Sequence, residues 1–180
     1  MKILVLIISL LAFPVALQAE TEKEIKKETK TQRLVAGLTG KAKTGSVRAQ
    51  TMLADIYLQG KGVIKDPAKA AYWMEMAAKQ GDVTAQFNIA MMYGRGDGVT
   101  ANSETAFQWF LKAAEQKDIA AQYKVALHYR DGIGAVKNTV AAKQWLQAVL
   151  NVSANGAESD RAKAIREQVQ ALAKKDLAAL

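Results

Sequence analysis

A repeated stretch constrains the fold of this chain more than any other feature. The segment AQFNIAMMYGRGDGVTAN, residues 85–102, is matched position for position by residues 49–66 and again by residues 121–138. Each copy begins 36 residues after the one before it. Self-similarity at a fixed period of this length is typical of repeat arrays, because one unit cannot bury its apolar face alone and must stack on its neighbours.

Each unit contains the pattern of two helices. In its first half, alanine, aliphatic and tyrosine positions recur about four residues apart, which places them on one helical face. In its second half, alanine, tryptophan and large apolar positions do the same. We expect these residues to form the core: Ala49, Leu53, Ala54, Tyr57, Ala70, Trp73 and Met74 in the first unit, with their counterparts 36 and 72 residues further along the chain.

The connection between the two helices has its own signals. Gly60, which recurs as Gly96 and Gly132, follows the tyrosine by three residues, where a helix commonly ends in the left-handed conformation that glycine tolerates. Asp66 recurs as an asparagine and precedes the second helix, where its side chain can accept a hydrogen bond from the first turn. Pro67 supports this start, since proline suits the first helical position.

The array begins and ends with variant segments. Residues 34–48 align with the second half of a unit, so we expect a half repeat there. After Gly156 the glycines do not return, and Ala162, Ile165, Val169 and Leu172 form one apolar stripe. This stripe predicts one longer helix, from about Asn155 to Ala178, that covers the open end of the array. We expect residues 34–156 to form the solenoid and residues 157–180 to form a C-terminal capping helix.

The first 19 residues have the layout of a secretory signal peptide. Lys2 precedes an apolar run over residues 3–13, followed by Pro14 and small residues. We expect cleavage after Ala19, an uncleaved amino-terminal anchor being the alternative. Residues 20–33 mix both charges and predict a charged linker or a frayed helix start. No second apolar run follows, so we expect an exported, periplasmic chain without a transmembrane segment after cleavage.

Composition limits the chemistry of the chain. It has no cysteine, which excludes disulfides, thiol nucleophiles and cysteine metal sites, and it has a single histidine, His128. The net charge is +8, but lysines are scattered without a basic block, so we expect no nucleic-acid partner. Two prolines and many alanines favour helix.

The repeated pattern, Ala-x3-Leu-Ala-x2-Tyr-x2-Gly-x-Gly-Val-x2-Asp-x3-Ala-x2-Trp-x3-Ala-Ala, resembles the Sel-one-like repeat, a relative of the tetratricopeptide repeat. The resemblance implies an all-α fold: a right-handed α-solenoid of antiparallel helix pairs, here with three full repeats, a half repeat and a capping helix. It also implies adaptor roles, often in bacterial envelopes. The chain departs from the family at Lys117 and Ser153, which replace a helix-ending glycine, and at residues 134–136, which look inserted.

Residues that differ between the units are the candidates for binding. On each first helix, three positions point away from the core at 100° per residue, and first helices line the concave side of such solenoids. We expect these positions to bind a protein or peptide partner in a groove: Met52, Asp55, Gln59, Asn88, Met91, Arg95, Lys124, Leu127 and Asp131. Met91 and Leu127 could instead be partly buried by neighbouring helices.

Two motifs suggest other functions but are explained by the repeat. Residues 94–98, GRGDG, resemble a glycine-rich phosphate loop and contain an Arg-Gly-Asp adhesion tripeptide. Gly96 and Gly98, however, occupy the turn positions of the repeat itself. His128 lies on a helix beside the core, with no nucleophile or metal cluster suggested nearby. We therefore assign no catalytic residue, cofactor or metal. The alternative function is an envelope enzyme acting on cell-wall or β-lactam substrates.

Overall fold

The computed structural model describes residues 15–152 and 160–180, and every regular element in them is a helix. The apolar run at residues 3–13, Ser153 and the expected helix start near Asn155 lie outside these residues. The helices are α2 (Val15–Lys43), α3 (Val47–Gln59), α4 (Pro67–Lys79), α5 (Val83–Arg95), α6 (Ser103–Glu115), α7 (Ile119–Asp131), α8 (Thr139–Leu150) and α9 (Asp160–Ala178).

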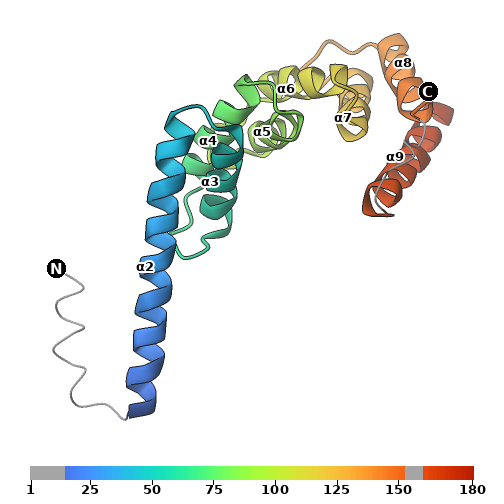
Figure 1. The fold of residues 1–180 in the computed structure, drawn as a ribbon. Coiled ribbons are helices and arrows are strands. Elements are labelled where there is room, and N and C mark those ends of the chain that lie inside the picture. Colours follow the sequence, from blue (N-terminus) through green and yellow to red (C-terminus); the bar gives the residue numbers. More distant parts are fainter. Residues whose placement is uncertain (1–14, 153–159) are drawn as a thin grey trace.

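The helices form an open arch of antiparallel pairs, which confirms the predicted solenoid. The pairs are α3 with α4, α5 with α6, and α7 with α8, and the second helix of one pair packs against the first helix of the next. Helix α2 packs on α3 at one end, and α9 packs on α8 and α7 at the other. In Figure 1 the first helices, α3, α5 and α7, follow the inner side of the arch, and α4 and α6 lie on its outer side.

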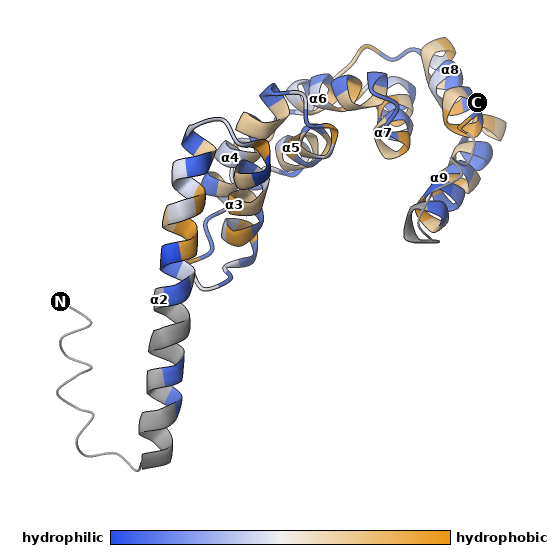
Figure 2. Cartoon of the chain, in the orientation of Figure 1, coloured by the Kyte–Doolittle hydropathy of each residue, from blue (hydrophilic) through white to orange (hydrophobic). Residues whose placement is uncertain are grey.

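The core consists of the repeated positions that the sequence predicts. Leu53, Ile89 and Val125 on the first helices are fully buried, and Trp73 and Trp109 on the second helices are only 8% exposed. Trp145, their counterpart in the last unit, is half-buried. Apolar residues are distributed along all the repeat helices rather than gathered in one centre (Figure 2), as expected when each unit buries its face against a neighbour.

The predicted helix ends are confirmed. The side chains of Asp66, Asn102 and Asn138 each accept a hydrogen bond of 2.9 Å from the backbone N–H three residues later. Gly60, Gly96 and Gly132 end the first helices with φ of 64°, 77° and 71°. Three further caps escaped the sequence analysis: the side chains of Ser46, Asp82 and Asp118 accept hydrogen bonds at the starts of α3, α5 and α7.

The two departures from the repeat pattern do not change its geometry. Lys117 takes the left-handed conformation of a helix-ending glycine, with φ of 68°, so α6 ends at Glu115, 36 residues after the end of α4 at Lys79. The interpretation of residues 134–136 as an insertion is wrong. The connections at residues 60–66, 96–102 and 132–138 have the same length, because α7 and α8 keep the 36-residue period.

The second glycine of each connection sets how closely the units stack. A Cβ atom at Gly98 would overlap the carbonyl oxygen of Pro67 at the start of α4, and one at Gly134 would overlap that of Ser103 at the start of α6. Each connection thus rests directly on the second helix of the preceding unit. A side chain at either position would push neighbouring units apart.

The N-terminal end of the array is a long helix. Helix α2 runs without a break through residues 20–33, which the charge pattern marked as a linker or frayed helix start, and into the half repeat. Leu38 and Ala42 are buried in the core, at the positions that the alignment with the repeat indicated.

At the other end, the predicted stripe of α9 is partly wrong. Val169 packs inward, but Ile165 and Leu172 are 45% and 42% exposed, and the buried residue is Ala173. The reason is a change of register. Gln170 donates a hydrogen bond to the carbonyl of Leu150 at 3.3 Å, as Gln122 does to Ala114 at 3.4 Å, yet it lies 48 residues after Gln122 rather than 36.

Candidate partner-binding groove

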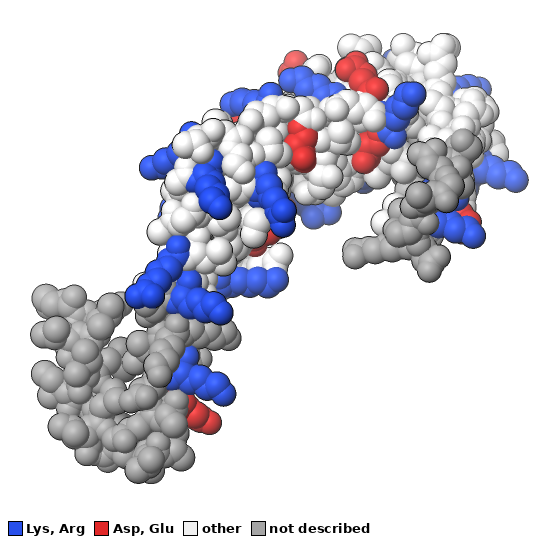
Figure 3. All heavy atoms as spheres, in the orientation of Figure 1, with Lys and Arg blue, Asp and Glu red and all other residues white. Residues whose placement is uncertain are grey.

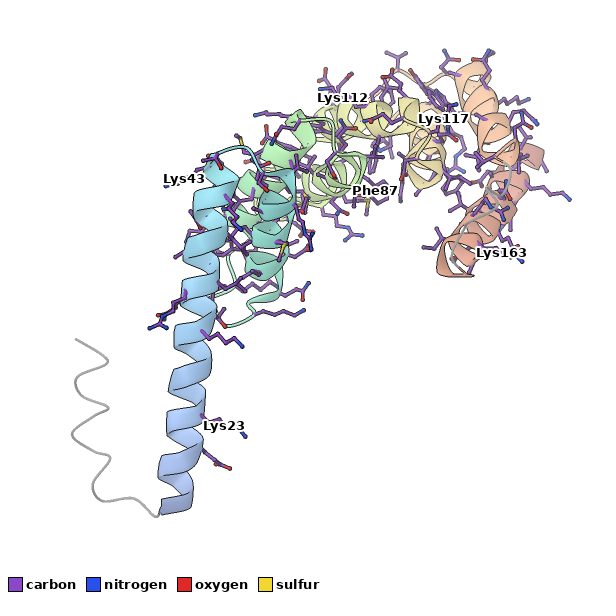
Figure 4. The ribbon with its side chains drawn as sticks, viewed as in Figure 1. Lys23, Lys43, Phe87, Lys112, Lys117 and Lys163 are labelled. Atoms are coloured by element: carbon purple, nitrogen blue, oxygen red, sulfur yellow. The ribbon has the colours of Figure 1, made fainter. Side chains whose placement is uncertain are left out.

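The nine predicted binding residues lie on the three helices that follow the inner side of the arch. Figure 4 supports this division of the surface, with Phe87 of α5 on the inner side and Lys112 of α6 on the outer side. The residues are Met52, Asp55 and Gln59 on α3, Asn88, Met91 and Arg95 on α5, and Lys124, Leu127 and Asp131 on α7. We call these nine residues the groove set.

The exposed members of the groove set combine charge with one apolar side chain. Asp55, Gln59, Arg95 and Asp131 are exposed, and Met52 is 38% exposed. Asn88 and Lys124 are half-buried. No salt bridge forms within the groove set among the described residues, so its charges on α3 and α5 face solvent. This surface suits a ligand that carries both charges and an apolar group.

Met91 and Leu127 are half-buried, which agrees with the alternative interpretation of these two positions. Met91 packs against the continuous core that joins the units. Its side chain therefore contributes to the stacking of the helices, and the exposed methionine of the groove is Met52. A flexible thioether adapts to irregular partner surfaces.

Asp131 is held in an ion-pair cluster that ties α7 to α9. The Arg130 guanidinium donates two hydrogen bonds to Asp131, at 2.7 and 2.9 Å, and lies 3.1 Å from the Asp176 carboxylate. The Tyr123 hydroxyl donates a 2.7 Å hydrogen bond to Asp176. Hydrogen bonding from Arg130 lowers the pKa of Asp131, and burial together with Asp176 raises the pKa of Tyr123 to about 12. Asp131 is therefore already paired within the chain, whereas Asp55 and Arg95 pair with no described residue.

A chain of buried glutamines, which the sequence analysis missed, lies beneath the helix junctions. Gln50, Gln86 and Gln122 are at least nine-tenths buried and donate to the carbonyls of Ala42, Ala78 and Ala114 in the preceding helix. The Nε2 atoms of Gln80 and Gln116 donate at 2.7 Å to the Oε1 atoms of Gln50 and Gln86. The same 36-residue alignment carries this signal, because every copy begins Ala-Gln.

The last glutamine lacks its second partner. Val152 stands where Gln80 and Gln116 stand in the earlier units, and the Oε1 atom of Gln122 accepts no hydrogen bond from any described residue. The glutamine pairs therefore join the two helices within each of the first two units, and the bonds from Gln86 to Ala78 and from Gln122 to Ala114 join each unit to the one before it.

His128 borders the core, as its position in the repeat indicated. Its ring lies 5.7 Å from that of Phe107 and 5.5 Å from that of Phe110, and its Nδ1 atom hydrogen-bonds the Ile133 carbonyl. Burial lowers the pKa of His128 below its usual value of 6.5. The aromatic neighbours and the carbonyl partner account for the histidine as a packing residue.

A cavity of about 610 Å³ opens beside the last connection. Phe107, Tyr129 and Ala135 form its apolar wall, and Glu104 and Lys137 lie at its edge. Ala135 replaces the valine found at positions 63 and 99, so two methyl groups are missing here. The sequence analysis did not identify this cavity.

The described residues contain neither a candidate metal site nor a membrane-spanning helix. No group of three or more His, Cys, Asp or Glu side chains there could hold a metal ion. No helix among them is long and apolar enough to cross a membrane.

Comparison with known proteins places the repeats within a family. The family model of the Sel1 repeat matches residues 47–82, 83–118 and 119–148. The chain is similar to the crystal structure of a Sel1 repeat protein from Oxalobacter formigenes, with 32% identity and a TM-score of 0.58 over 76% of this chain and 98% of that one.

It is also similar to c5321, described as a protective antigen of uropathogenic Escherichia coli strains displaying an SLR fold. The identity is 27% and the TM-score is 0.48, over 63% of this chain and 32% of that one. No curated protein matches the chain.

Proposed function

This chain belongs to the Sel1 repeat family, and from that premise we propose that it is an exported scaffold that binds a partner peptide or protein domain in its concave groove. Sel1 repeat proteins generally serve as protein–protein interaction scaffolds. The more specific parts of the proposal are the export, the envelope location and the use of the groove set.

One observation supports the proposal that the groove set binds the partner. The residues that pack the units together stay apolar from copy to copy, whereas the groove set differs in size, polarity and charge at each position. Stacking does not require this variation, since Asp55, Gln59 and Arg95 face solvent. Variable exposed residues on an otherwise uniform scaffold are the usual location of recognition in repeat proteins.

The exposed side chains indicate the chemistry of the partner. Asp55 on α3 and Arg95 on α5 favour a segment with both a basic and an acidic group, and Met52, about one turn before Asp55, favours an apolar side chain beside the basic group. The charges would mainly set on-rate and salt dependence, while the apolar contact would contribute more to affinity.

Site-specific photo-crosslinking in intact cells tests the groove. A photoreactive residue replaces Asp55 or Arg95 in the groove, and Lys143, an exposed residue of α8, provides the matched control. We expect both groove positions to capture the same partner and the control to capture none. Capture from position 143 with none from 55 or 95 would place the binding face on the second helices and refute the proposal.

A second variant measures the contribution of charge. With the photoreactive residue at position 55, Arg95→Glu should lower the yield of crosslinked partner by about tenfold at low salt. The reason is that this substitution reverses a charge in the groove. Lys143→Glu makes the same change on α8 and should leave recovery unaltered. Arg95→Glu should not change the melting temperature, since Arg95 is exposed.

The export part of the proposal rests on residues 1–19 of the sequence. Amino-terminal sequencing of the protein released by osmotic shock should find a start at or near Glu20. Recovery of the chain with an intact Met1 from the membrane fraction would favour the anchored alternative instead.

A further inference from the structure

The first connection of the array lies directly against α2. A Cβ atom at Gly62 would meet the side chain of Thr31 at 2.6–2.8 Å, so the loop between α3 and α4 passes within contact distance of the α2 helix at that residue. The loop and the middle of α2, far apart in the sequence, therefore form one continuous surface at the N-terminal end of the arch.

This surface is basic. Lys61 and Lys65 flank the contact on the loop, and Lys30 adjoins it on α2; all three are exposed. Lys23 lies two turns before Lys30 on the same face of α2, and Figure 4 shows it on the side from which the loop projects. Figure 3 shows basic side chains gathered where the loop meets α2.

None of these four lysines forms an ion pair with a described residue. Two lysines of the next helix differ in this respect. Lys69, at the start of α4, pairs with Asp66 at 2.9 Å, and Lys79 pairs with Glu75 at 2.8 Å. These four charges, which pair with no described residue, lie on one surface, so an anionic partner would lower their mutual repulsion.

An aliphatic side chain projects from the middle of these charges. Ile64 lies between Lys61 and Lys65 in the loop and is 91% exposed. The fold does not require it, because the corresponding loop of the second unit has Thr100 at this position, Asp97 in place of Lys61 and Ala101 in place of Lys65. Both loops nevertheless have the same length and the same left-handed glycines.

We propose that the basic patch, defined as Lys23, Lys30, Lys61, Ile64 and Lys65, docks the protein on an anionic lipid surface. The lysines would lie against the headgroups, and Ile64 would enter the boundary between headgroups and acyl chains. This combination of cations with an inserted apolar side chain is the chemistry of interfacial membrane binding. A nucleic-acid site would present aromatic or planar hydrogen-bonding groups in place of an aliphatic residue.

Cosedimentation of the full chain with lipid vesicles tests the proposal. The vesicles contain either phosphatidylcholine alone or phosphatidylcholine with about one third phosphatidylglycerol. The test variant carries Lys61→Asp, Ile64→Thr and Lys65→Ala, which place at these positions the residues of the second loop, a loop of the same length with the same left-handed glycines. Residues 1–19 are the same in both proteins, so any binding by the apolar run is common to both.

We expect the wild-type chain to bind anionic vesicles at least tenfold more strongly than neutral ones. The loop variant should lose about a thousandfold of this binding, because its net charge falls by three units at about fivefold each and Ile64→Thr contributes about tenfold more. Ile64→Thr alone should lose about tenfold. Raising the salt concentration from 0.1 to 0.5 M should weaken wild-type binding but leave the loss caused by Ile64→Thr.

Val136→Thr is the matched control. Val136 is the counterpart of Ile64 in the last connection and is 88% exposed, but it lies far from α2. Its substitution should not alter vesicle binding. Equal binding of wild type and loop variant to anionic vesicles would overturn the proposal. So would wild-type binding to a single-stranded oligonucleotide that the loop variant loses, without any binding to vesicles.

Discussion

The buried glutamines provide a sensitive test of how the helices are joined. Gln86 makes two side-chain hydrogen bonds, to the Ala78 carbonyl at 3.2 Å and from Gln116 at 2.7 Å. Gln122, at the same position of the next unit, makes one, at 3.4 Å to the Ala114 carbonyl. Replacement of each by methionine keeps the volume of the side chain and removes its hydrogen bonds. We expect Gln86→Met to be clearly more destabilising than Gln122→Met.

The magnitudes follow from the partners. Gln86→Met removes two hydrogen bonds, each contributing about 0.5–1.5 kcal/mol, so it should cost about 2 kcal/mol. The Ala78 carbonyl keeps the backbone N–H of Gly81 at 3.0 Å, which limits the loss. Gln122→Met removes one long hydrogen bond but also a buried oxygen that has no partner among the described residues. These effects oppose each other, and the net change should be below about 0.5 kcal/mol.

Thermal unfolding followed by circular dichroism measures the difference. For a chain of this size, 1 kcal/mol corresponds to about 2–4 °C, so Gln86→Met should melt about 4–8 °C below the wild type and Gln122→Met close to it. In a double-mutant cycle, Gln116→Ala should couple to Gln86→Met, because the two side chains share a bond. Equal losses from the two methionine variants, or no coupling, would show that the bond between Gln86 and Gln116 does not stabilise the fold as its distance indicates.

Two further predictions concern the repeated core. Trp109→Ala should cost about 3–5 kcal/mol, and Trp145→Ala clearly less, because Trp109 is 8% exposed with Lys112 over its ring at 4.2 Å whereas Trp145 is half-buried; equal melting temperatures would contradict the assigned layers. In wild type, the unfolded state takes up a proton at about pH 6.5, before the buried His128 does, so the free energy of unfolding should fall as the pH drops below that value. His128→Met, which introduces the residue found at position 92, should remove this part of the pH dependence between pH 7 and 5, and an unchanged slope would show that another group titrates.

Most of the fold could be predicted because the repeat states the same local rules three times. One copy of Tyr-x2-Gly-x-Gly suggests a turn, but three copies in register identify a helix end, a connection and a second helix. The buried tryptophan position of each second helix and its aspartate or asparagine cap were predicted for the same reason. Lys117 shows the limit of this argument, since a residue that opposes the local rule still adopts the left-handed conformation, at the position that Gly45 and Gly81 occupy in the earlier copies.

The candidate groove was less predictable. Helical periodicity identifies which residues lie opposite the core-facing side of a helix. It does not show how deeply neighbouring helices cover those residues. Met91 illustrates the difference, because it points away from the buried stripe of α5 and yet packs against the continuous core. Asp131 illustrates a second limit: its ion-pair cluster depends on Asp176, 45 residues away on a helix that does not follow the repeat.

The register of α9 explains why the end of the array differs from its middle. A fourth unit in phase would place residue 158 against the end of α8, but Gln170 occupies that place and donates to the carbonyls of Val149, Leu150 and Val152. With the helix shifted by 12 residues, Val169, Ala173 and Leu177 face the core where Ala157, Arg161 and Ile165 would stand in phase. Only the shifted register puts apolar side chains at all three positions and brings Asp176 to Tyr123 and Arg130. Helix α9 therefore ends the array in the register that both buries its apolar side chains and pairs Asp176, and not in the register that would continue the 36-residue period.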